Sequence, residues 1–244
     1  MNPEAYVDMA ATESTHWWFC ARRKILGCAI EAMDLPPDAR ILEVGSGTGG
    51  NLVMLSQYGK LSAIEMDASA RELSVKKTNG KFTVRAGNCP DNLPLADERF
   101  DLICMFDVLE HIDEDVETLT TLRKHLAPGG RMLITVPAYP WLWSAHDDFL
   151  HHKRRYTART LRHTFNRSGL HVDRITYFNM WLLPLVAVAR LKDRITLSKK
   201  SSGTATPSPL VNSTLHAVFC SERHMLKRFN LPVGVSLMGV ARVA

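Results

Sequence analysis

This 244-residue sequence has few cysteines, no long apolar run and no leader-like start. The five cysteines are scattered without a Cys-x-x-Cys pair or metal-ligand spacing, so we expect reduced thiols, no disulfide and no metal site. The longest apolar run, residues 180–191, is shorter than the about 20 residues that span a bilayer. The opening MNPEAYVDMA contains acidic residues and no apolar core, so we expect no signal peptide and a cytoplasmic location. A hydrophobic content of 45% is typical of a globular domain.

Acidic residues are also missing from one long stretch, between Phe149 and Val172. The segment HHKRRYTARTLRHTFNR within it carries six lysines and arginines, and the whole chain has a net charge of +5. Such a block is typical of a surface that meets an anionic substrate, a membrane headgroup or a nucleic acid. A solvated helix face is the alternative, and the sequence leaves both open.

Short apolar runs alternate with helix-like stretches from residue 40 onward. This alternation predicts parallel strands joined by right-handed crossovers. A helix over 114–126 would begin at Asp113 as N-cap and stop at the turn APGG. The expected strands are residues 40–44, 61–65, 81–85, 100–106 and 131–136, and the other expected helices are near 50–59 and 69–78.

The pattern changes after residue 150, where a helix over 157–168, a strand over 171–178 and a final strand within 233–243 are expected. The last two strands lack a crossover helix suited to a parallel step, which favours an antiparallel edge. The segment SSGTATPSP, residues 201–209, is typical of a flexible linker, and a second helix is expected near 210–230.

We therefore predict one α/β domain of the doubly wound, Rossmann-like kind. Its mostly parallel, seven-stranded sheet would have an antiparallel C-terminal edge strand and a helical insert before that strand. The expected parts are a helical cap over residues 1–37, a core over 38–178, the insert over 179–231 and the last strand over 232–244.

The stretch LEVGSGTGG, residues 42–50, fits two cofactor loops. Gly45, Gly47 and Gly50 form G-x-G-x-x-G, which holds a dinucleotide pyrophosphate. Glu43, however, ends an apolar strand at the edge where ligands bind in such sheets, and an unpaired buried carboxylate is costly. A carboxylate there repels a diphosphate and attracts a cation, which favours S-adenosylmethionine (SAM) over NAD. A local partner for Glu43 is the alternative.

Glu65 ends the second expected strand, 20 residues after Gly45. A carboxylate at this place accepts hydrogen bonds from both ribose hydroxyls of an adenosine cofactor. It supports a nucleoside without choosing between the two cofactors. Asp67 is expected to cap the helix that begins near Ala68.

Four motifs in order make the chain similar to the class I SAM-dependent methyltransferases. They are ILEVGSGTGGNL, AIEMD, RAGNCPDNLPLADERFDLICMFDVLEHI and LAPGGRMLITVP, and the likeness covers residues 38–178 and the final strand. The resemblance implies SAM as cofactor and S-adenosylhomocysteine as product. In this family the residues at the matching motif positions contact, in order along the chain, the methionine part of SAM, the ribose and the adenine, and then line the pocket past the fourth strand. The residues so implied are Glu43, Gly45, Ser46, Gly47, Gly49, Glu65, Met66, Asn88, Cys89, Phe106, Asp107 and Val108.

One of these residues departs from the family pattern, because Asn88 stands where the family's adenine-binding turn has aspartate. Two further segments, HWWFCARRKIL at 16–26 and HDDFLHHKRRYTARTL at 146–161, resemble a group of bacterial methyltransferases, and DVLEHI resembles methyltransferases of quinone biosynthesis. By that resemblance a helix with Trp17, Trp18 and Phe19 covers the cofactor, Trp18 meets the substrate, and Arg22 reaches the cofactor carboxylate. Packing of these aromatic rings into the core is an equally good interpretation.

Methyl transfer needs alignment and a dry site, and it needs a base only when a hydroxyl must lose its proton. The candidate bases are His111, His146 and His152. His111 is also consistent with a structural role. His146 lies beside Asp147 after the fifth strand, where substrate loops of this fold usually sit, and either a catalytic or a positioning role fits it.

The acceptor expected from these patterns is amphiphilic and anionic, such as a lipid, isoprenoid or quinone-like precursor. Arg154, Arg155 and Tyr156 are suited to hold a carboxylate or phosphate, and His146 and Asp147 complete the expected substrate site. The apolar-then-basic segment 180–200 favours peripheral contact with the cytoplasmic face of a membrane. No nucleic-acid partner is expected.

Three other functions stay open at this stage. An NAD-dependent oxidoreductase could use Gly45, Gly47 and Gly50, although the sequence lacks a suitably placed Tyr-x-x-x-Lys dyad. A nucleic-acid methyltransferase could use the basic run, although the chain lacks an N/D-P-P-Y/F/W motif and a catalytic Pro-Cys. A non-catalytic SAM-binding module is the third. The acceptor atom and the oligomeric state are not determined by the sequence.

Overall fold

The computed structural model describes the backbone of residues 3–196 and 206–243, and the side chains of residues 5–190 and 206–243. Most of the expected linker at 201–209, and the side chains of the basic residues at 192–200, lie outside these ranges.

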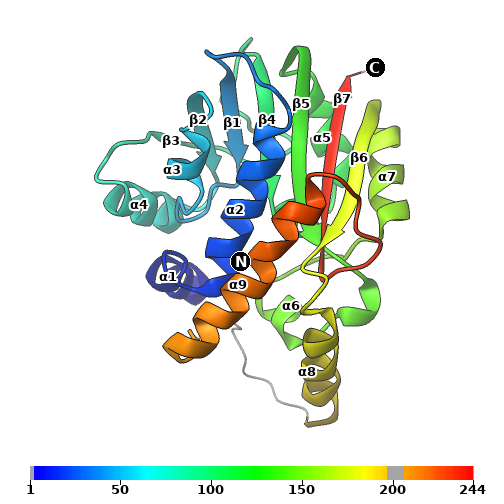
Figure 1. Ribbon diagram of the computed structural model, residues 1–244. Coiled ribbons are helices and arrows are strands. Elements are labelled where there is room, and N and C mark those ends of the chain that lie inside the picture. The colour runs from blue at the N-terminus through cyan, green and yellow to red at the C-terminus, as the bar shows by residue number, and fades with distance from the viewer. Residues whose placement is uncertain (1–2, 197–205, 244) are drawn as a thin grey trace.

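One seven-stranded sheet forms the centre of the described residues (Figure 1). Its order is β3-β2-β1-β4-β5-β7-β6, and the first five of these strands run parallel. The predicted doubly wound, Rossmann-like fold is therefore confirmed. The strands are β1 Arg40–Val44, β2 Lys60–Glu65, β3 Val84–Ala86, β4 Phe100–Phe106, β5 Leu126–Pro137, β6 Leu170–Phe178 and β7 Ser236–Val243.

The last strand is antiparallel, as predicted, but it does not lie at the edge. β7 pairs with β5 on one side and with β6 on the other, so β6 takes the edge position. The burial of the two strands explains this order. Residues 236–241 are all buried, which suits a strand covered on both faces, whereas β6 exposes polar residues such as His171 and Asp173.

Helices cover both faces of the sheet. Figure 1 shows α2 and α9 side by side on one face, with α5 and α7 behind the sheet. Each face buries its own apolar cluster, one around Phe165 of α7 and one around Phe219 of α9. The helices are α1 Pro3–Thr12, α2 Trp17–Glu31, α3 Leu52–Leu55, α4 Ala68–Lys77, α5 Asp115–Arg123, α6 Ala145–Phe149, α7 Ala158–Arg167, α8 Leu183–Thr196 and α9 Pro209–Leu226, with 3₁₀ turns η1 Leu109–His111 and η2 Pro140–Leu142.

Local signals set several helix ends where the sequence predicted them. The Asp67 carboxylate accepts a hydrogen bond from the Ala70 N–H and caps α4. The Thr157 hydroxyl caps α7, which ends just before Gly169 with its positive φ of 73°. The predicted helix over 50–59 is reduced to the four residues of α3.

The predicted stop signal APGG is wrong, because residues 127–130 lie inside β5. β5 begins at Leu126 opposite Phe100, and the register with β4 then shifts before Leu102. Gly129 has a φ of 77°, a backbone conformation that favours glycine. The glycine pair therefore allows the irregular start of β5. Asp113 also does not cap α5, whose N-cap is Glu114 without a side-chain hydrogen bond.

The insert between β6 and β7 holds α8 and α9, in agreement with the predicted helices. The Glu222 carboxylate of α9 is buried and accepts hydrogen bonds from the backbone N–H groups of Asn179, Met180 and Trp181, at 2.6, 2.6 and 3.0 Å. These bonds fix the chain just before α8. Among the described helices, none combines the length and the apolar character that a bilayer crossing requires.

Candidate active site

The glycine-rich loop follows β1 at the carboxyl edge of the sheet. It is fixed to the neighbouring strand, because the N–H groups of Gly45 and Ser46 both donate to the Ile64 carbonyl, at 2.8 and 3.1 Å. Gly45 has a φ of +72° and no room for a side chain, since a Cβ there would lie 2.5 Å from Val108 Cγ2. A Cβ on Gly47 would meet nothing within 4 Å. The loop is thus tightly packed at Gly45 and has free space at Gly47. Such space lets a ligand come close to the protein backbone.

Glu65 ends β2 beside this loop and is buried. Its Oε2 accepts a hydrogen bond from the Gly47 N–H at 2.8 Å, and its Oε1 accepts one from the Asp67 N–H at 2.9 Å. A carboxylate can accept about four hydrogen bonds, so lone pairs remain for ribose hydroxyls. The geometry fits the predicted ribose role.

Glu43 is the buried carboxylate that the sequence placed near the SAM amino end. Its Oε1 accepts a hydrogen bond from the Asn51 side chain at 2.9 Å, while its Oε2 has no partner among the described residues. Burial raises the pKa of Glu43 to about 8. An orphaned buried carboxylate oxygen beside an open loop fits a cationic ligand, so the residues present are compatible with SAM.

Arg22 of α2 reaches the end of β4, where it has partners within the protein. Its guanidinium pairs with Asp107 at 2.6 Å and donates to Thr135 Oγ1 at 2.8 Å. It also lies over the rings of Trp18 and Phe106, at 4.9 and 5.5 Å from their centroids. The structure thus gives Arg22 the Asp107 carboxylate as its counter-charge, and its predicted contact with the cofactor carboxylate stays a prediction.

The aromatic start of α2 packs towards α9. The Trp17 ring lies 6.0 Å from that of Phe219 in an edge-on contact, and Trp17 and Trp18 border the apolar cluster on that face. Trp17 and Trp18 are partly buried, in line with the core interpretation, whereas Phe19 contacts the Trp18 ring at 5.0 Å and is not part of that cluster. The predicted substrate contact of Trp18 stays a prediction.

Instead, α1 and the residues after it lie against the cofactor loop. The Thr48 hydroxyl donates to the Glu13 carboxylate at 2.5 Å, and Lys77 of α4 pairs with the same carboxylate. Burial, together with nearby Glu65 and Asp67, raises the pKa of Tyr6. Sequence reasoning missed Glu13 and Tyr6, because nothing near them in the sequence marks a ligand site.

The expected adenine side is more open. Met66 is 68% exposed directly after β2. Asn88 is exposed, and its backbone pairs with that of Asn92 across a short turn. Burial raises the pKa of the Cys89 thiol to about 12, so the Cys89 side chain in this turn is an uncharged thiol at neutral pH. Their predicted contacts with adenine stay predictions.

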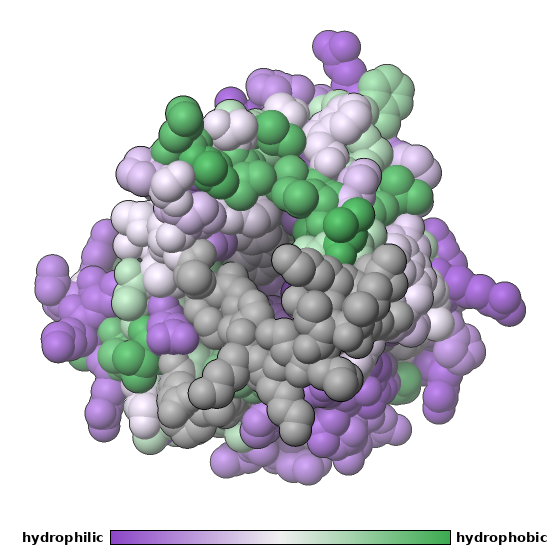
Figure 2. All heavy atoms as spheres, turned by 90° about the horizontal axis from the view of Figure 1, so that it is seen from below, coloured by the Kyte–Doolittle hydropathy of each residue, from purple (hydrophilic) through white to green (hydrophobic). Residues whose placement is uncertain are grey.

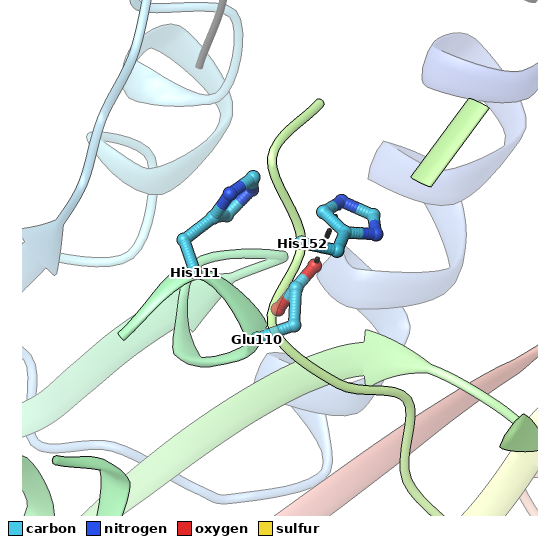
Figure 3. A group of neighbouring side chains, drawn as sticks. All are labelled: Glu110, His111 and His152. Carbon is cyan, nitrogen blue, oxygen red and sulfur yellow. Dashed lines mark ion pairs between the residues drawn. The ribbon is translucent and has the colours of Figure 1, made fainter. Parts of the chain in front are cut away.

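Glu110, His111 and His152 form a cluster past β4 (Figure 3). Glu110 is fully buried, and both its carboxylate oxygens lack a hydrogen-bond partner among the described residues. Burial and nearby Asp107 raise its pKa well above the ordinary value. Burial and the neighbouring His152 lower the pKa of His111 to about 3, so that ring is neutral.

The donor atoms of this cluster lie within 4.8 Å of one another, close enough to surround one small ligand atom, water molecule or metal ion. The sequence predicted no metal site, and the geometry of these three side chains would allow one. Glu110 was not singled out from the sequence, where it is one letter within DVLEHI.

Asp147 is fully buried and has three partners around it. It accepts hydrogen bonds from Arg155 Nε at 2.7 Å and Arg155 Nη2 at 3.1 Å, and its Oδ1 lies 2.8 Å from His152 Nδ1. Its Oδ2 also accepts from the Ser144 N–H and so caps α6. Burial alone would raise the pKa of Asp147, but the hydrogen bonds from His152 and Arg155 hold it well below its ordinary value.

The predicted anion-binding pair Arg155 and Tyr156 is directed inward. Arg155 is buried against Asp147 and also donates to the Ala138 carbonyl at 3.0 Å. The Tyr156 hydroxyl is buried and donates to Asp115 Oδ2 at 2.8 Å. The structure therefore gives both residues, and Asp147, internal partners in place of the expected acceptor.

The rest of the basic run contains both paired and exposed charges. Lys153 lies 3.1 Å from Asp113, and Arg154 lies 3.1 Å from Asp115. The arginines exposed along α7 are Arg159, Arg162 and Arg167, which fits a solvated helix face. The predicted anionic partner of the run stays a prediction.

His146 of α6 has a buried Nδ1 that lacks a partner among the described residues. Burial and the Arg190 charge lower its pKa to about 4. It is a neutral ring near His152, and no contact given by the described residues orients it as a base.

A methyltransferase-domain family model matches residues 20–175. A protein from a Streptomyces fradiae transposon is 28% identical over 159 residues, which are 63% of this chain and 44% of that protein. A Cereibacter sphaeroides ubiquinone biosynthesis O-methyltransferase is 32% identical over 98 residues, 38% of this chain and 39% of the relative. The chain thus spans about two fifths of the length of these curated relatives.

Solved structures show the same fold. A chain in the complex between the Haloferax volcanii Trm112 methyltransferase activator and a methyltransferase matches with a TM-score of 0.63 and 17% identity, covering 98% of this chain and 93% of that one. A geranyl diphosphate C-methyltransferase from Streptomyces coelicolor, solved with S-adenosyl-L-homocysteine, matches with a TM-score of 0.56 and 14% identity, covering 86% and 74%. Together with the glycine loop, Glu43 and Glu65, these matches show that the chain belongs to the methyltransferase-domain family and has S-adenosylmethionine as its cofactor.

Proposed function

We propose that this protein transfers the methyl group of SAM to an amphiphilic, anionic acceptor of the lipid, isoprenoid or quinone-like class, presented at a membrane surface. The observation that carries the proposal is a set of exposed apolar side chains at the carboxyl edge of the sheet, where the cofactor loop also lies. On the insert this set includes Trp181, Leu185 and Val188, which are 52%, 58% and 67% exposed.

Other elements extend the set. Trp141 of η2 and Leu210 and Val211 of α9 are also exposed large apolar residues. Figure 2 shows the molecule from below, the side on which α1 and α8 project, and apolar patches are visible there between polar ones. Contiguous exposed apolar surface is typical of a site that meets a membrane or an apolar ligand.

Charge supports an anionic partner. The chain carries a net charge of +5 and a pI of about 9.0, and residues 192–200 are rich in lysine and arginine in the sequence. Each basic residue near an anionic surface contributes about 1 kcal/mol to binding. The names of two relatives are compatible with the acceptor class, one a ubiquinone biosynthesis O-methyltransferase and one a geranyl diphosphate C-methyltransferase.

The chain's own residues supply positioning and charge. SAM, when bound, supplies an electrophilic methyl group. The Gly45–Gly47 turn and Glu65 would hold it, Glu43 would offset its positive charge, and the side chains around Phe106 would exclude water. Because the electrophile is already activated, alignment of the acceptor accounts for most of the catalysis.

Vesicle co-sedimentation tests the membrane part of the proposal. The full chain should bind phosphatidylglycerol vesicles at low salt and bind phosphatidylcholine vesicles weakly, since anionic headgroups add attraction. A variant with Trp181, Leu185 and Val188 changed to serine should lose most of that binding. The matched control changes Val75 of α4 and Phe229 and Val233 of the loop after α9, which are also exposed apolar residues, to serine. Equal binding of both variants would contradict the proposal.

The exposed arginines of α7 favour one alternative, a nucleic-acid acceptor. RNA or DNA binding that falls steeply with salt concentration would support it, since phosphate contacts release counterions. A non-catalytic SAM-binding module would instead bind S-adenosylhomocysteine and show no methyl transfer from labelled SAM to any acceptor tested.

A further inference from the structure

The cluster of Glu110, His111 and His152 lies past the end of β4, next to the glycine-rich loop. Along the carboxyl edge, the expected adenosine contacts are at β3 and β2, and the methionine contacts are at β1. The next strand is β4. Val108, the second residue after β4, packs against Gly45, and η1 with Glu110 and His111 begins at the next residue. The cluster therefore continues the line from adenosine through methionine towards the acceptor side.

Two separate segments form this cluster. Glu110 and His111 come from η1, while His152 comes from the segment after α6, and Figure 3 shows the three side chains gathered there. The Lys153 N–H donates to the Glu110 carbonyl at 2.7 Å, which ties the two segments together. The His111 and His152 rings are 4.7 Å apart at 78°. A backbone hydrogen bond and a ring contact thus hold the two segments of the cluster together.

His152 has a defined orientation. Its Nδ1 lies 2.8 Å from Asp147 Oδ1, and the two hydrogen bonds from Arg155 keep Asp147 in place as an ionised carboxylate. An ionised carboxylate accepts, so Nδ1 carries the ring proton and the lone pair of neutral His152 is on Nε2. That Nε2 lies 4.0 Å from Glu110 Oε1. His152 thus has the partner that a general base requires, whereas the Nδ1 of His146 has none among the described residues.

The Glu110 carboxylate is the part of this cluster that lacks a hydrogen-bond partner among the described residues. Both oxygens of Glu110 are buried without a hydrogen bond in the described part of the chain, whereas buried polar groups are normally paired. A polar group of a ligand placed between Glu110, His111 and His152 would satisfy them. Leu109, beside Glu110 in η1, is fully buried, and Val108 and Ile112 on either side of η1 pack against the same apolar cluster, so such a group would be partly desolvated.

We propose that the acceptor atom is a hydroxyl oxygen held by this cluster, and that His152 is its general base. The inference rests on the proposed methyl transfer and adds the acceptor group and the base. The hydroxyl proton passes to His152 Nε2 as the oxygen attacks the SAM methyl carbon. A C–O bond forms, the C–S bond breaks, and its electron pair stays on sulfur as S-adenosylhomocysteine. Asp147 stabilises the imidazolium, and Arg155 is a positioning residue. A free amine needs no such base, which is why the cluster favours a hydroxyl.

The test uses 4-nitrocatechol, whose absorption reports its ionisation, with the full chain loaded with S-adenosylhomocysteine. The wild type should ionise the bound probe at a pH well below its free pKa. His152→Gln should reduce the ionised fraction at least tenfold, and Asp147→Asn should do so to a lesser degree. Glu110→Gln should weaken probe binding. His163→Gln, on the exposed side of α7, is the control and should match the wild type. The groups facing His152 are Glu110 and His111 from η1, His146 and Asp147 from α6, and Arg155, so the pH profile is measured in each background.

Thermal stabilisation by S-adenosylhomocysteine is measured in every variant, which separates the two proposals. If the ligand stabilises none of the proteins, the proposed function fails. If all variants bind it and His152→Gln still ionises the probe like the wild type, only the present inference fails. One equivalent of a divalent ion in the purified protein, with ionisation abolished by a chelator, would also overturn it. In a turnover assay with labelled SAM and a long-chain catechol carboxylate, His152→Gln should lose about 10²–10⁴-fold in rate. Equal loss for the corresponding aniline would overturn the hydroxyl assignment.

Discussion

Replacing Asp147 by asparagine should destabilise the whole fold. Asp147 and Arg155 are almost completely buried, with side-chain exposures of 0% and 5%. The amide keeps the shape of the carboxylate but removes its charge, so the Arg155 guanidinium is left buried without a counter-charge. Breaking a buried pair in this way costs about 3–5 kcal/mol in the free energy of unfolding. Lost hydrogen bonds to Ser144 and His152 add to the effect.

A second ion pair in the same segment supplies the comparison. Lys153 and Asp113 are 46% and 62% exposed, and exposed pairs of this kind contribute about 0–1 kcal/mol. Lys153→Met should therefore have little effect. A double variant with Asp147→Leu and Arg155→Met removes both buried charges and should recover much of the loss, because an apolar pair avoids the desolvation cost.

Urea unfolding at pH 7, with the slope checked for each variant, measures these differences. The pH dependence gives an independent check. Because the pKa of Asp147 is lowered in the folded state, its stabilisation is present above the ordinary carboxylate pKa and is lost as the pH falls through the folded value. The deficit of Asp147→Asn should thus shrink in acid. If Asp147→Asn and Lys153→Met cost the same at pH 7, the internal role assigned to this pair is wrong.

Three further predictions concern the cofactor side. Gly45→Ala should abolish thermal stabilisation by S-adenosylhomocysteine, because the new Cβ would collide with Val108. That stabilisation is about 2.7 kcal/mol at a hundredfold excess of ligand over the dissociation constant. Gly80→Ala, which has a similar φ of +70° and open space around it, is the control and should keep the stabilisation. The pKa of Glu43 is raised from 4.5 to about 8 in the ligand-free fold, so its contribution to stability is complete below 4.5 and is lost as the pH rises through 8. Glu43→Gln should flatten that decline in chemical denaturation, and an unchanged slope would refute the assigned pKa. A Cβ on Gly50 would collide with the Glu13 carboxylate, so Gly50→Ala should speed hydrogen exchange in α1. Gly47→Ala, where a Cβ meets nothing, should not. Equal exchange in both variants would argue against the contact of Glu13 with the glycine-rich loop.

The parts of the fold that could be predicted are those that depend on neighbours in sequence. Strand β4 matches its apolar run residue for residue, and the caps at Asp67 and Thr157 are short-range signals. The turn signal APGG failed because pairing with β4 decides whether a glycine pair ends a helix or begins a strand. The position of β7 depends on which strand can be buried on both faces, and such a comparison needs the whole sheet.

The candidate site divides in the same way. Glu43 and Glu65 could be predicted because a charge at the end of an apolar strand is visible in one line of sequence. Arg155 was misjudged because its partner, Asp147, lies across a turn and both are buried, while an arginine within a basic run resembles a surface residue. Glu13 gave no signal at all, since its contact with Thr48 joins positions 35 apart.

The antiparallel pair of β6 and β7 has a consequence for how the insert relates to the catalytic fold. Phe178 and Ser236 are register partners, so the segment 179–235 leaves the sheet and returns to it at a single rung. A segment attached in this way can grow or shrink without changing the order of the strands, whereas a parallel pair would require a crossover. Yet α9 also packs along α2, the helix that carries Arg22, and Asn212 accepts a hydrogen bond from the Trp17 N–H. The insert is thus free to vary in length by topology, while the packing of α9 ties it to the helix that carries Arg22.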